Sequence, residues 1–540
     1  MNHKTYKKVA LVILDGFGVA PNGHGNAISQ AQTPTLNYIV SNFPSLALQA
    51  SGPLVGLPWG EMGNSEVGHL NIGAGRIVGQ DLPRITNAIQ SGEFFNNQVF
   101  LDAVKHVKKN NSSLHLVGLN SSGGVHSLDE HLYALLGLAA NNGLLDKVFI
   151  HMFTDGRDTG PKVALESLKK LDERIGRNGA GRVATIAGRF YAMDRAGHWN
   201  QTMETYAALV DGKGQTAINP EQAVSNSYNS QIFDEMIKPT VILGNDGQPV
   251  TKISDNDSVI FFNFRSDRAL QLAQAFTMPQ IVPEAFRRQP LKNLYFVTMT
   301  EYAPELPVHV AFPYVGLKNN LAEVISNAGL TQFHIAESEK YAHVTAFFNC
   351  GKTEKYKGEE RVIINSPENN AQNYSDHPEM SAEAVAGSLA QKISTSTTNF
   401  FVANFANCDM VGHTGSLRAG MMAVEFIDKC LKLVLEACLK ADAVLIITAD
   451  HGNIEQMINP KNGEIDKDHT TNPVPFLLAA NEFKSPKSFD RNYAFLASLV
   501  PAGVICDIAP VILDLFGLPK PVEMTGINLL EVIDEVPRKI

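Results

Sequence analysis

A serine in the glycine-rich stretch Glu61–His69 has the setting of a catalytic nucleophile. Glycines on both sides of Ser65 leave the backbone free to approach other groups closely. A serine hydroxyl reacts poorly unless a base or a metal ion stabilises its alkoxide, so another part of the chain would have to activate it. The stretch alone is equally consistent with a glycine-rich turn that contains an incidental serine.

Aspartate and histidine residues later in the chain recur in pairs typical of divalent metal sites. Asp409 and His413 are four residues apart, which on a helical turn places both on one face. Asp450 and His451 follow the apolar run Ala443–Thr448, and adjacent ligands at a strand end can point in two directions. Carboxylates and imidazoles together suit Mn²⁺, Zn²⁺ or iron. One such pair would more often be a surface hydrogen bond, but here the pattern occurs twice.

With two further residues, the set contains three carboxylates and three imidazoles, which is enough for two neighbouring metal ions. Two ions side by side suit an in-line displacement at phosphorus, in which one prepares the attacking oxygen and both screen the developing charge. They would also supply Ser65 with its activator. The six candidate ligands are Asp15, Asp409, His413, Asp450, His451 and His469.

Arginines recur just beyond the ends of predicted strands in the middle of the chain. Guanidinium groups bind carboxylate and phosphate oxygens in pairs, so several that converge on one cleft would hold a small, multiply charged anion. A single arginine is more often a surface ion-pair partner, and the repetition at one edge favours a binding site. The arginines are Arg157, Arg189, Arg195, Arg265 and Arg268, and His126 and Asp158 lie in the same polar loops.

The elements that must position these residues indicate an α/β fold. Short apolar runs alternate with amphipathic segments, which predicts a largely parallel sheet. Asp15 follows the first of these runs, and ligand sites in such sheets favour the carboxyl ends of strands, although Asp15 could also cap the next helix. The predicted strands are Val9–Leu14, Leu114–Leu119, Val148–Phe153, Val183–Ala187, Val259–Phe264, Leu294–Met299, Asn399–Ala406 and Ala443–Thr448.

The length of 540 residues argues for two or more domains. Because the candidate metal ligands lie near both ends of the chain, the region between them looks inserted into a metal domain. We therefore expect one discontinuous metal-binding domain and one inserted domain. The expected ranges are 1–79 with 316–540 for the first, and 80–315 for the second.

Composition excludes several classes of function. The net charge is −10 and Lys/Arg residues form no long runs, which disfavours a surface for nucleic acid or anionic membranes. No stretch reaches the roughly 18 apolar residues that a membrane helix needs, and the apolar run that ends before Asp15 reads as a strand and not as a signal peptide. The five cysteines form no C-x-x-C pair, which fits a reducing cytoplasm.

Seven motifs spread over nearly the whole chain resemble those of the cofactor-independent, or 2,3-bisphosphoglycerate-independent, phosphoglycerate mutases, and their conjunction is highly specific. The part that carries Ser65 and the metal ligands is also similar to the wider alkaline-phosphatase superfamily. The motifs are Asp15-Gly-Phe-Gly18, Met62–His69, Asp155-Gly-Arg157-Asp158, Arg265 with Arg268, Ser338–His343, Asp409–His413 and Thr448–Asn453.

The resemblance implies an alkaline-phosphatase-like metal domain interrupted by a phosphotransferase domain. It implies that Ser65 takes the phosphoryl group from 3-phosphoglycerate and that the retained glycerate takes it back on its 2-hydroxyl, without 2,3-bisphosphoglycerate. One departure is visible, because Ala346 and Cys350 stand where similar proteins usually have a phenylalanine and a glycine. This departure affects only the expected packing near Lys340.

The resemblance also assigns roles residue by residue. Asp158 would handle a proton near the glycerate hydroxyls, and Lys340 would stabilise charge on the phosphoryl group. One Mn²⁺ would be held by Asp15, Ser65, Asp450 and His451, and the other by Asp409, His413 and His469, with Co²⁺ or Mg²⁺ as other candidates. Substrate would be bound by His126, Arg157, Asp158, Arg189, Arg195, Arg265, Arg268 and Lys340.

Two other functions are compatible with the same residues. The first is a metal-dependent phosphohydrolase or another phosphomutase with the same metal core, although the arginine-rich region favours an acidic substrate. The second is a catalytically silent metal-binding scaffold, which the presence of Ser65 together with all six ligand candidates disfavours. The resemblance implies a monomer that acts on a small molecule, phosphoglycerate, and we expect a cytoplasmic protein with no nucleic-acid or membrane partner.

Overall fold

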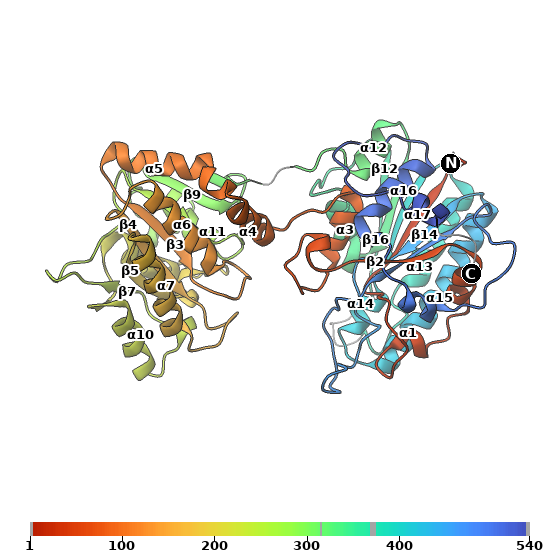
Figure 1. Cartoon of the computed structure of the whole chain (residues 1–540), viewed down its shortest axis with the longest axis horizontal. Coiled ribbons are helices and arrows are strands. Elements are labelled where there is room, and N and C mark those ends of the chain that lie inside the picture. Colours follow the sequence, from red (N-terminus) through yellow and green to blue (C-terminus); the bar gives the residue numbers. More distant parts are fainter. Residues whose placement is uncertain (1–3, 314–315, 368–373, 536–540) are drawn as a thin grey trace. The chain divides into compact units, whose positions relative to one another are not determined.

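The computed structural model describes residues 4–313, 316–367 and 374–535, and the chain forms two compact units (Figure 1). The first unit combines residues 1–80 with residues 316–540, and the second comprises residues 81–315. The described residues nearest to each end of the sequence therefore belong to the first unit. Residues 315 and 540, at which expected domain ranges end, lie outside the described residues.

The first unit is built on an eight-stranded sheet. Its first five strands are parallel neighbours, whereas β15 pairs antiparallel with strands on both sides. β1 (VALVIL) is fully buried, as expected for a strand covered on both faces. In spatial order the strands are β12 (Glu359–Ile364), β11 (Gln332–Glu337), β13 (Phe400–Phe405), β1 (Val9–Leu14), β14 (Val444–Thr448), β15 (Val474–Ala479), β2 (Ser45–Gln49) and β16 (Gly503–Val504).

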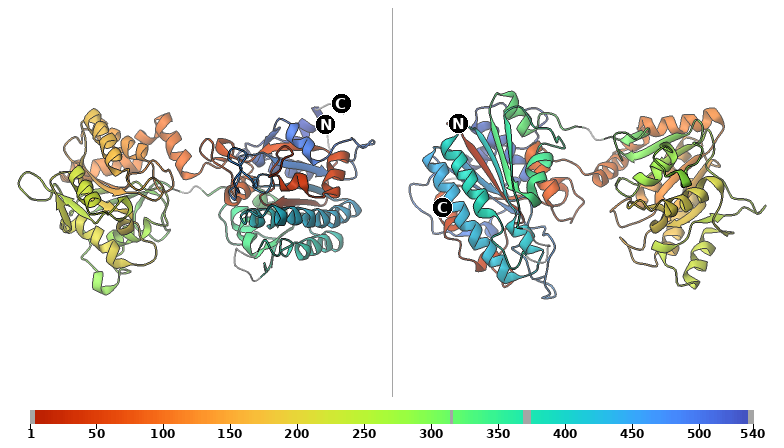
Figure 2. Two further views of the ribbon diagram at one scale, coloured as in Figure 1. Left: turned by 90° about the horizontal axis from the view of Figure 1, so that it is seen from below. Right: turned by 180° about the vertical axis from the view of Figure 1, so that it is seen from behind.

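Helices cover both faces of this sheet (Figure 2). The two long helices α13 (Ala382–Thr395) and α15 (Leu417–Lys440) lie side by side on one face. On the other face, α3 (Ser65–Ala74), α12 (Leu321–Asn327) and α16 (Ile508–Leu515) pack against one another. The remaining helices of this unit are α1 (Ala27–Gln30), α2 (Pro34–Asn42), α14 (Asn407–Gly412) and α17 (Leu529–Glu535).

The second unit contains another eight-stranded sheet, which is parallel except where β5 meets β7. Apolar side chains on its two faces form two separate core clusters, because successive residues of a strand point to opposite sides. In spatial order the strands are β10 (His309–Phe312), β9 (Tyr295–Thr300), β8 (Ser258–Phe261), β3 (Leu114–Leu119), β4 (Val148–Thr154), β5 (Arg182–Gly188), β7 (Thr240–Ile242) and β6 (Gln215–Ala217).

Each core cluster of the second unit has its own helices. Those packed over the first cluster are α4 (Asp81–Ser91), α5 (Gln98–Asn110), α6 (Asp129–Asn141), α7 (Ala164–Asn178) and α10 (Pro220–Asn229). Those over the second are α8 (Arg189–Ala192), α9 (Trp199–Tyr206) and α11 (Leu270–Thr277). The expected fold class is thereby confirmed, with two α/β bodies of which one interrupts the other in sequence.

One predicted strand ends earlier than its apolar pattern indicates. The run Val259–Phe264 leaves the sheet after Phe261, where β8 ends. Beyond that point the Asn263 side chain accepts the backbone N–H of Leu119 at 2.9 Å, so a side chain replaces the backbone ladder. The backbone N–H groups of Phe264 and Arg265 then donate to the His126 carbonyl oxygen at 2.9 and 3.3 Å, which joins two of the loops that carry candidate anion-binding residues. Within the described residues, no helix is long and apolar enough to cross a membrane.

Candidate active site

Four neighbouring parallel strands of the first unit, in the order β11, β13, β1 and β14, end at one edge of the sheet. Asp15 directly follows β1, and Asp450 lies two residues beyond β14. Lys340 lies three residues beyond β11, and Asp409 lies in α14 immediately after β13. Parallel strands bring their carboxyl ends together, so the fold gathers these four side chains at one edge.

Ser65 reaches the same edge at the first residue of α3. The helix start is fixed by Asn64, whose side chain accepts the Val67 N–H at 2.9 Å. Gly68 allows α3 to approach Asp450 closely, because a Cβ at this position would lie 2.5 Å from the Asp450 Cβ and 2.6 Å from its carbonyl oxygen. The glycine at position 68 is therefore required by the close approach of α3 to the Cβ and backbone of Asp450.

The Ser65 hydroxyl is buried among charged groups. Its Oγ lies 3.0 Å from Asp15 Oδ1 and 3.1 Å from His451 Nε2. Lys340 Nζ donates to Ser65 Oγ at 2.7 Å, to Asp15 Oδ1 at 2.7 Å and to Asp409 Oδ2 at 2.6 Å. The hydroxyl thus lies next to one ammonium, one imidazole and one carboxylate.

The charges at this edge support one another despite their burial. Burial opposes the ammonium form of Lys340, but Asp15 and Asp409 outweigh it and raise the pKa of the amine above its usual value. Burial also opposes the carboxylate form of Asp15, yet the Lys340 charge lowers the pKa of that carboxyl well below its usual range. Both groups are therefore ionised at neutral pH.

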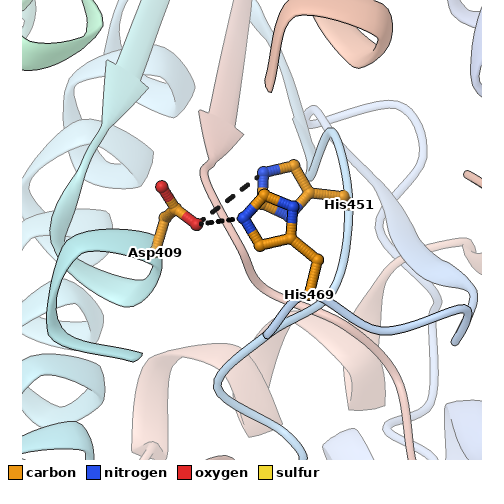
Figure 3. A group of neighbouring side chains, drawn as sticks. All are labelled: Asp409, His451 and His469. Atoms are coloured by element: carbon orange, nitrogen blue, oxygen red, sulfur yellow. Dashed lines mark ion pairs between the residues drawn. The ribbon is translucent and has the colours of Figure 1, made fainter. Parts of the chain in front are cut away.

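Asp409 is the centre of one group of possible metal ligands (Figure 3). His469 Nε2 lies 3.1 Å and His451 Nε2 lies 3.8 Å from Asp409 Oδ1. His413 Nε2 lies 3.2 Å from the same oxygen and 3.2 Å from His469 Nε2. Three imidazoles thus point toward one carboxylate oxygen.

Asp15, Asp450 and His451 form a second such group, so His451 belongs to both. Asp409 Oδ1 and Asp450 Oδ2 are buried and accept no hydrogen bond within the described residues. Buried carboxylate oxygens normally have partners, and these two have imidazole nitrogens as their neighbours. A divalent cation in each group would satisfy them, so the residues present fit two metal ions.

The second unit repeats the arrangement with a different set of side chains. Its neighbouring strands β8, β3, β4 and β5 are followed by the loops that carry the candidate anion-binding residues. Arg189 is almost fully buried directly after β5 and binds Asp155 Oδ1 at 2.6 Å and Asp158 Oδ2 at 2.5 Å. Its charge is thus balanced by two carboxylates.

Asp267 lies close to three of the candidate anion-binding residues. It pairs with Arg195 Nη1 at 2.7 Å and with Arg265 Nε at 3.2 Å, and His126 Nδ1 lies 3.5 Å away. Burial lowers the pKa of His126 to about 4, helped by the charge of Arg189, so this imidazole is neutral at physiological pH.

Arg268 and Arg157 are less well neutralised. Arg268 has no carboxylate partner within the described residues and donates only to the Met193 carbonyl oxygen at 3.4 Å. Burial and then the charges of Arg195, Arg189 and Arg157 lower its pKa. Among the residues that the structure describes, the Arg157 guanidinium pairs only with Glu235, at 3.7 Å. An anion with several charges would relieve this repulsion.

Comparison with known proteins agrees with this geometry. A protein of Methanosarcina acetivorans named 2,3-bisphosphoglycerate-independent phosphoglycerate mutase 1 is 49% identical over 526 residues, which are 97% of this chain and 98% of the relative. The chain belongs to the 2,3-bisphosphoglycerate-independent phosphoglycerate mutases. A Clostridioides difficile protein named for the same activity is 46% identical over 97% of this chain and 99% of its own length.

Two further comparisons concern the inserted region and the fold. Residues 85–304 match the family model described as the BPG-independent PGAM N-terminus. A crystal structure of Leishmania mexicana phosphoglycerate mutase at low cobalt concentration shares 28% identity, covers 96% of this chain and 97% of that chain, and has a TM-score of 0.62.

In this phosphoglycerate mutase the candidate site residues form two groups, one in each unit. The group in the first unit consists of Asp15, Ser65, Lys340, Asp409, His413, Asp450, His451 and His469. The group in the second unit consists of His126, Arg157, Asp158, Arg189, Arg195, Arg265 and Arg268.

Sequence reasoning misses several residues that contact these groups. His69 is fully buried, with Nδ1 2.8 Å from the Ser65 carbonyl oxygen and 3.2 Å from Asp450 Oδ2. Asn404 donates to Asp15 Oδ2 at 2.7 Å. His69 is four residues beyond Ser65 and could have been found from that spacing, whereas Asn404 lies inside an apolar strand and gives no signal.

Proposed function

We propose that this chain interconverts 3-phosphoglycerate and 2-phosphoglycerate through a phosphoserine on Ser65, with two divalent metal ions and without 2,3-bisphosphoglycerate. The observation that carries the proposal is the position of Ser65 Oγ, which lies within 3.1 Å of Asp15, His451 and Lys340. Membership of the phosphoglycerate mutase family supports the choice of substrate.

We assign the ligands as two sets that share one edge of the sheet. Asp15, Ser65, Asp450 and His451 would hold one ion, and Asp409, His413 and His469 would hold the other. Bound there, the ions would lower the cost of forming the Ser65 alkoxide and screen charge on the phosphoryl group. Mn²⁺ is our proposed metal, because this mixture of carboxylate and imidazole ligands suits it.

The chain's own residues then account for the transfer. Ser65 Oγ loses its proton and bonds to phosphorus, the bond from phosphorus to the substrate 3-oxygen breaks, and that oxygen takes up a proton. In the second half, the glycerate 2-hydroxyl loses a proton and its oxygen bonds to phosphorus. The bond from phosphorus to Ser65 Oγ breaks, and Oγ takes up a proton. Lys340 stays protonated and stabilises the charged phosphoryl oxygens in both halves.

We assign substrate binding to the arginine cluster of the second unit together with Lys340. The five arginines and His126 offer donors to the carboxylate and hydroxyl groups of glycerate. Asp158 is the proposed proton-handling group, since its side chain is 16% exposed, whereas Asp155, the other carboxylate that pairs with Arg189, is 1% exposed. We further propose that the protein acts as a monomer in the cytoplasm.

The test measures conversion of 3-phosphoglycerate by metal-stripped protein with and without Mn²⁺, in the absence of 2,3-bisphosphoglycerate, while free phosphate is followed. Turnover that requires Mn²⁺ and releases little phosphate would support the mutase. Release of phosphate without isomerisation would indicate a phosphohydrolase instead and would overturn the assignment of the second unit.

A variant separates the role of the serine from that of the ions. Ser65→Ala should lower kcat by at least about 10⁴-fold, because the nucleophile is lost. Intact-mass analysis should find a phosphoryl adduct in the wild type after quenching and none in the variant. Unchanged turnover by Ser65→Ala would exclude the phosphoserine mechanism.

A further inference from the structure

The loops that carry the metal ligands of the first unit meet at one buried carboxylate, Glu455. The side chain is almost fully buried and belongs to neither group of possible ligands. Its Oε2 accepts the backbone N–H of Gly18 at 3.0 Å and that of Asn453 at 2.8 Å. Its Oε1 accepts the Thr470 hydroxyl in a short hydrogen bond and the Asn472 amide at 2.9 Å.

Each donor lies close in sequence to a ligand. Gly18 is three residues beyond Asp15, Asn453 is two residues beyond His451, and Thr470 directly follows His469. One carboxylate therefore joins the loop of Gly18 to two loops that lie more than 400 residues later in the chain.

The Glu455 carboxylate explains why two positions in the sequence motifs are occupied by glycine. A Cβ at Gly18 would overlap the carboxylate of Glu455. A Cβ at Gly452 would overlap the Thr470 hydroxyl and Glu455 Oε1. The backbone of Gly452 also accepts the Thr470 N–H at 2.9 Å, which joins the second and third loops again. Both loops are thus shaped to pass directly over Glu455.

The charge of Glu455 is balanced only by these donors. Within the described residues, no lysine, arginine or histidine forms an ion pair with it. A buried carboxylate without a cation is stable only when its oxygens accept several well-placed hydrogen bonds. Its four donors meet that need, and any loop that moved away would leave an acceptor unsatisfied.

We propose that Glu455 is a positioning residue for the metal centre, which holds the loops of Asp15, His451 and His469 at the separation that two ions require. The inference rests on the proposed function, since it assumes that these residues bind metal. Residues that orient metal ligands without touching the ion commonly change metal affinity by 10- to 100-fold when they are replaced.

The variant Glu455→Gln tests this role with little change of shape. The amide can still accept from Gly18 and Asn453, but its NH₂ then faces Thr470 and Asn472, which must both reverse their hydrogen bonds. We expect the dissociation constant for Mn²⁺, measured by titration calorimetry of the metal-stripped full-length protein, to rise about tenfold or more. Glu455→Ala removes both acceptor oxygens, and with them all four hydrogen bonds, and should weaken binding further.

A matched control is Asp428→Asn in α15. Asp428 is equally buried in the same unit and accepts the backbone N–H groups of Thr35 and Leu36 at 3.0 and 2.8 Å, but it bonds to no loop that carries a ligand. This variant should lose thermal stability without losing Mn²⁺ affinity.

The outcomes separate the two proposals. If Glu455→Gln binds Mn²⁺ with wild-type affinity, the positioning role is wrong and the metal centre stands. The same holds if Asp428→Asn, at a matched loss of thermal stability, loses as much Mn²⁺ affinity as Glu455→Gln. If the wild-type protein itself binds no Mn²⁺, both the metal centre and the role of Glu455 are wrong.

Discussion

His451 lies in both groups of candidate ligands, and its protonation couples metal binding to pH. Burial opposes its charged form, but Asp450, Asp15 and Asp409 outweigh this effect and raise its pKa to about 10. The metal-free protein therefore carries a protonated His451 at pH 7, whereas a metal ligand must be neutral. Binding of Mn²⁺ should then release about one proton from this residue, and affinity should fall about tenfold per unit as pH decreases below 10.

Titration calorimetry in buffers with different ionisation enthalpies measures this proton release directly. The observed heat should vary with the buffer at pH 7, because the released proton is taken up by the buffer. Heats that are identical in PIPES and Tris buffers would contradict the prediction. The comparison needs no variant, so it is free of changes in folding.

Glu337, the last residue of β11, should make the folded protein less stable as pH rises, whereas the affinity for Mn²⁺ should rise with pH. It is fully buried, and burial raises its pKa to about 7. Between about pH 4.5 and 7 the folded chain keeps a proton that the unfolded chain has released, so stability falls as pH rises through this window. The rise of this pKa from 4.5 to about 7 corresponds to a loss of about 3 kcal/mol in the free energy of unfolding above pH 7. Glu337→Gln should remove that loss.

The measurement is the difference in Tm between Glu337→Gln and the wild type at pH 5 and at pH 8. The difference should favour the variant more strongly at pH 8. Glu360→Gln is the control, because Glu360 is half exposed on the adjacent strand and pairs with Lys392. If the Tm difference between Glu337→Gln and the wild type were the same at pH 5 and pH 8, burial would not raise the pKa of this carboxyl in the folded protein.

Residues with their own chemical signature were predictable from the sequence, and residues defined by their partners were not. Ser65, Asp409 and His413 are marked by glycines or by helical spacing. Glu455 and Asp267 look like ordinary acidic residues, because their roles depend on donors supplied by distant segments. Such roles become visible only when the strand order brings those segments together.

At the scale of elements, α3 depends on two glycines where it packs against its neighbours. A Cβ at Gly68 would overlap Asp450, and one at Gly73 would overlap the Phe348 carbonyl oxygen. Gly68→Ala would force α3 away from the metal edge, at a cost of about 1–3 kcal/mol. We expect a lower Tm, and also weaker Mn²⁺ binding because Ser65 and Asp450 move apart.

Gly387→Ala in α13 is the matched control for this helix. No atom outside the helix lies within 4 Å of the Cβ that this substitution adds. The usual preference of helices for alanine should therefore stabilise the protein by about 0.5–1 kcal/mol. If Gly68→Ala behaved in the same way as Gly387→Ala, the close approach of α3 to Asp450 would not be a constraint in solution.

Parallel strands were easier to predict than the rest of each sheet. β1 and β3 match the predicted runs residue for residue, because both are buried over their full length. The sequence does not predict β2, in which only Ala47 and Leu48 are buried, or β15, which contains Pro475. Their strand identity depends on antiparallel pairing with each other, which is a tertiary property.

At the scale of the molecule, the two units divide the chemistry. The first contains the proposed nucleophile, the buried lysine and the proposed metal ligands, and the second contains the arginine cluster proposed to bind substrate. The sequence predicts this division because ligand motifs occur near both chain ends while the arginines lie between them. It follows that phosphoryl transfer to Ser65 and retention of glycerate should be separable by mutation.

Arg268→Ala tests that separation. Arg268 has no carboxylate partner within the described residues, so its removal leaves no unpaired buried anion. Loss of a charged hydrogen bond to glycerate should cost about 2 kcal/mol or more, which lowers kcat/KM for 3-phosphoglycerate by about 30-fold. Poorly held glycerate should also leave before the second transfer, so a larger share of turnovers should end in free phosphate.

Hydrolysis of p-nitrophenyl phosphate is the readout that isolates the first unit. This donor requires Ser65 and the ions but offers no glycerate to the arginines, so its slow hydrolysis should be the same in Arg268→Ala and in the wild type. Arg182→Ala, at the exposed start of β5, should change neither activity. If Arg268→Ala lost both activities in parallel, Arg268 would support the fold and not the binding of glycerate. The arginine cluster would then no longer be the site that holds glycerate between the two transfers.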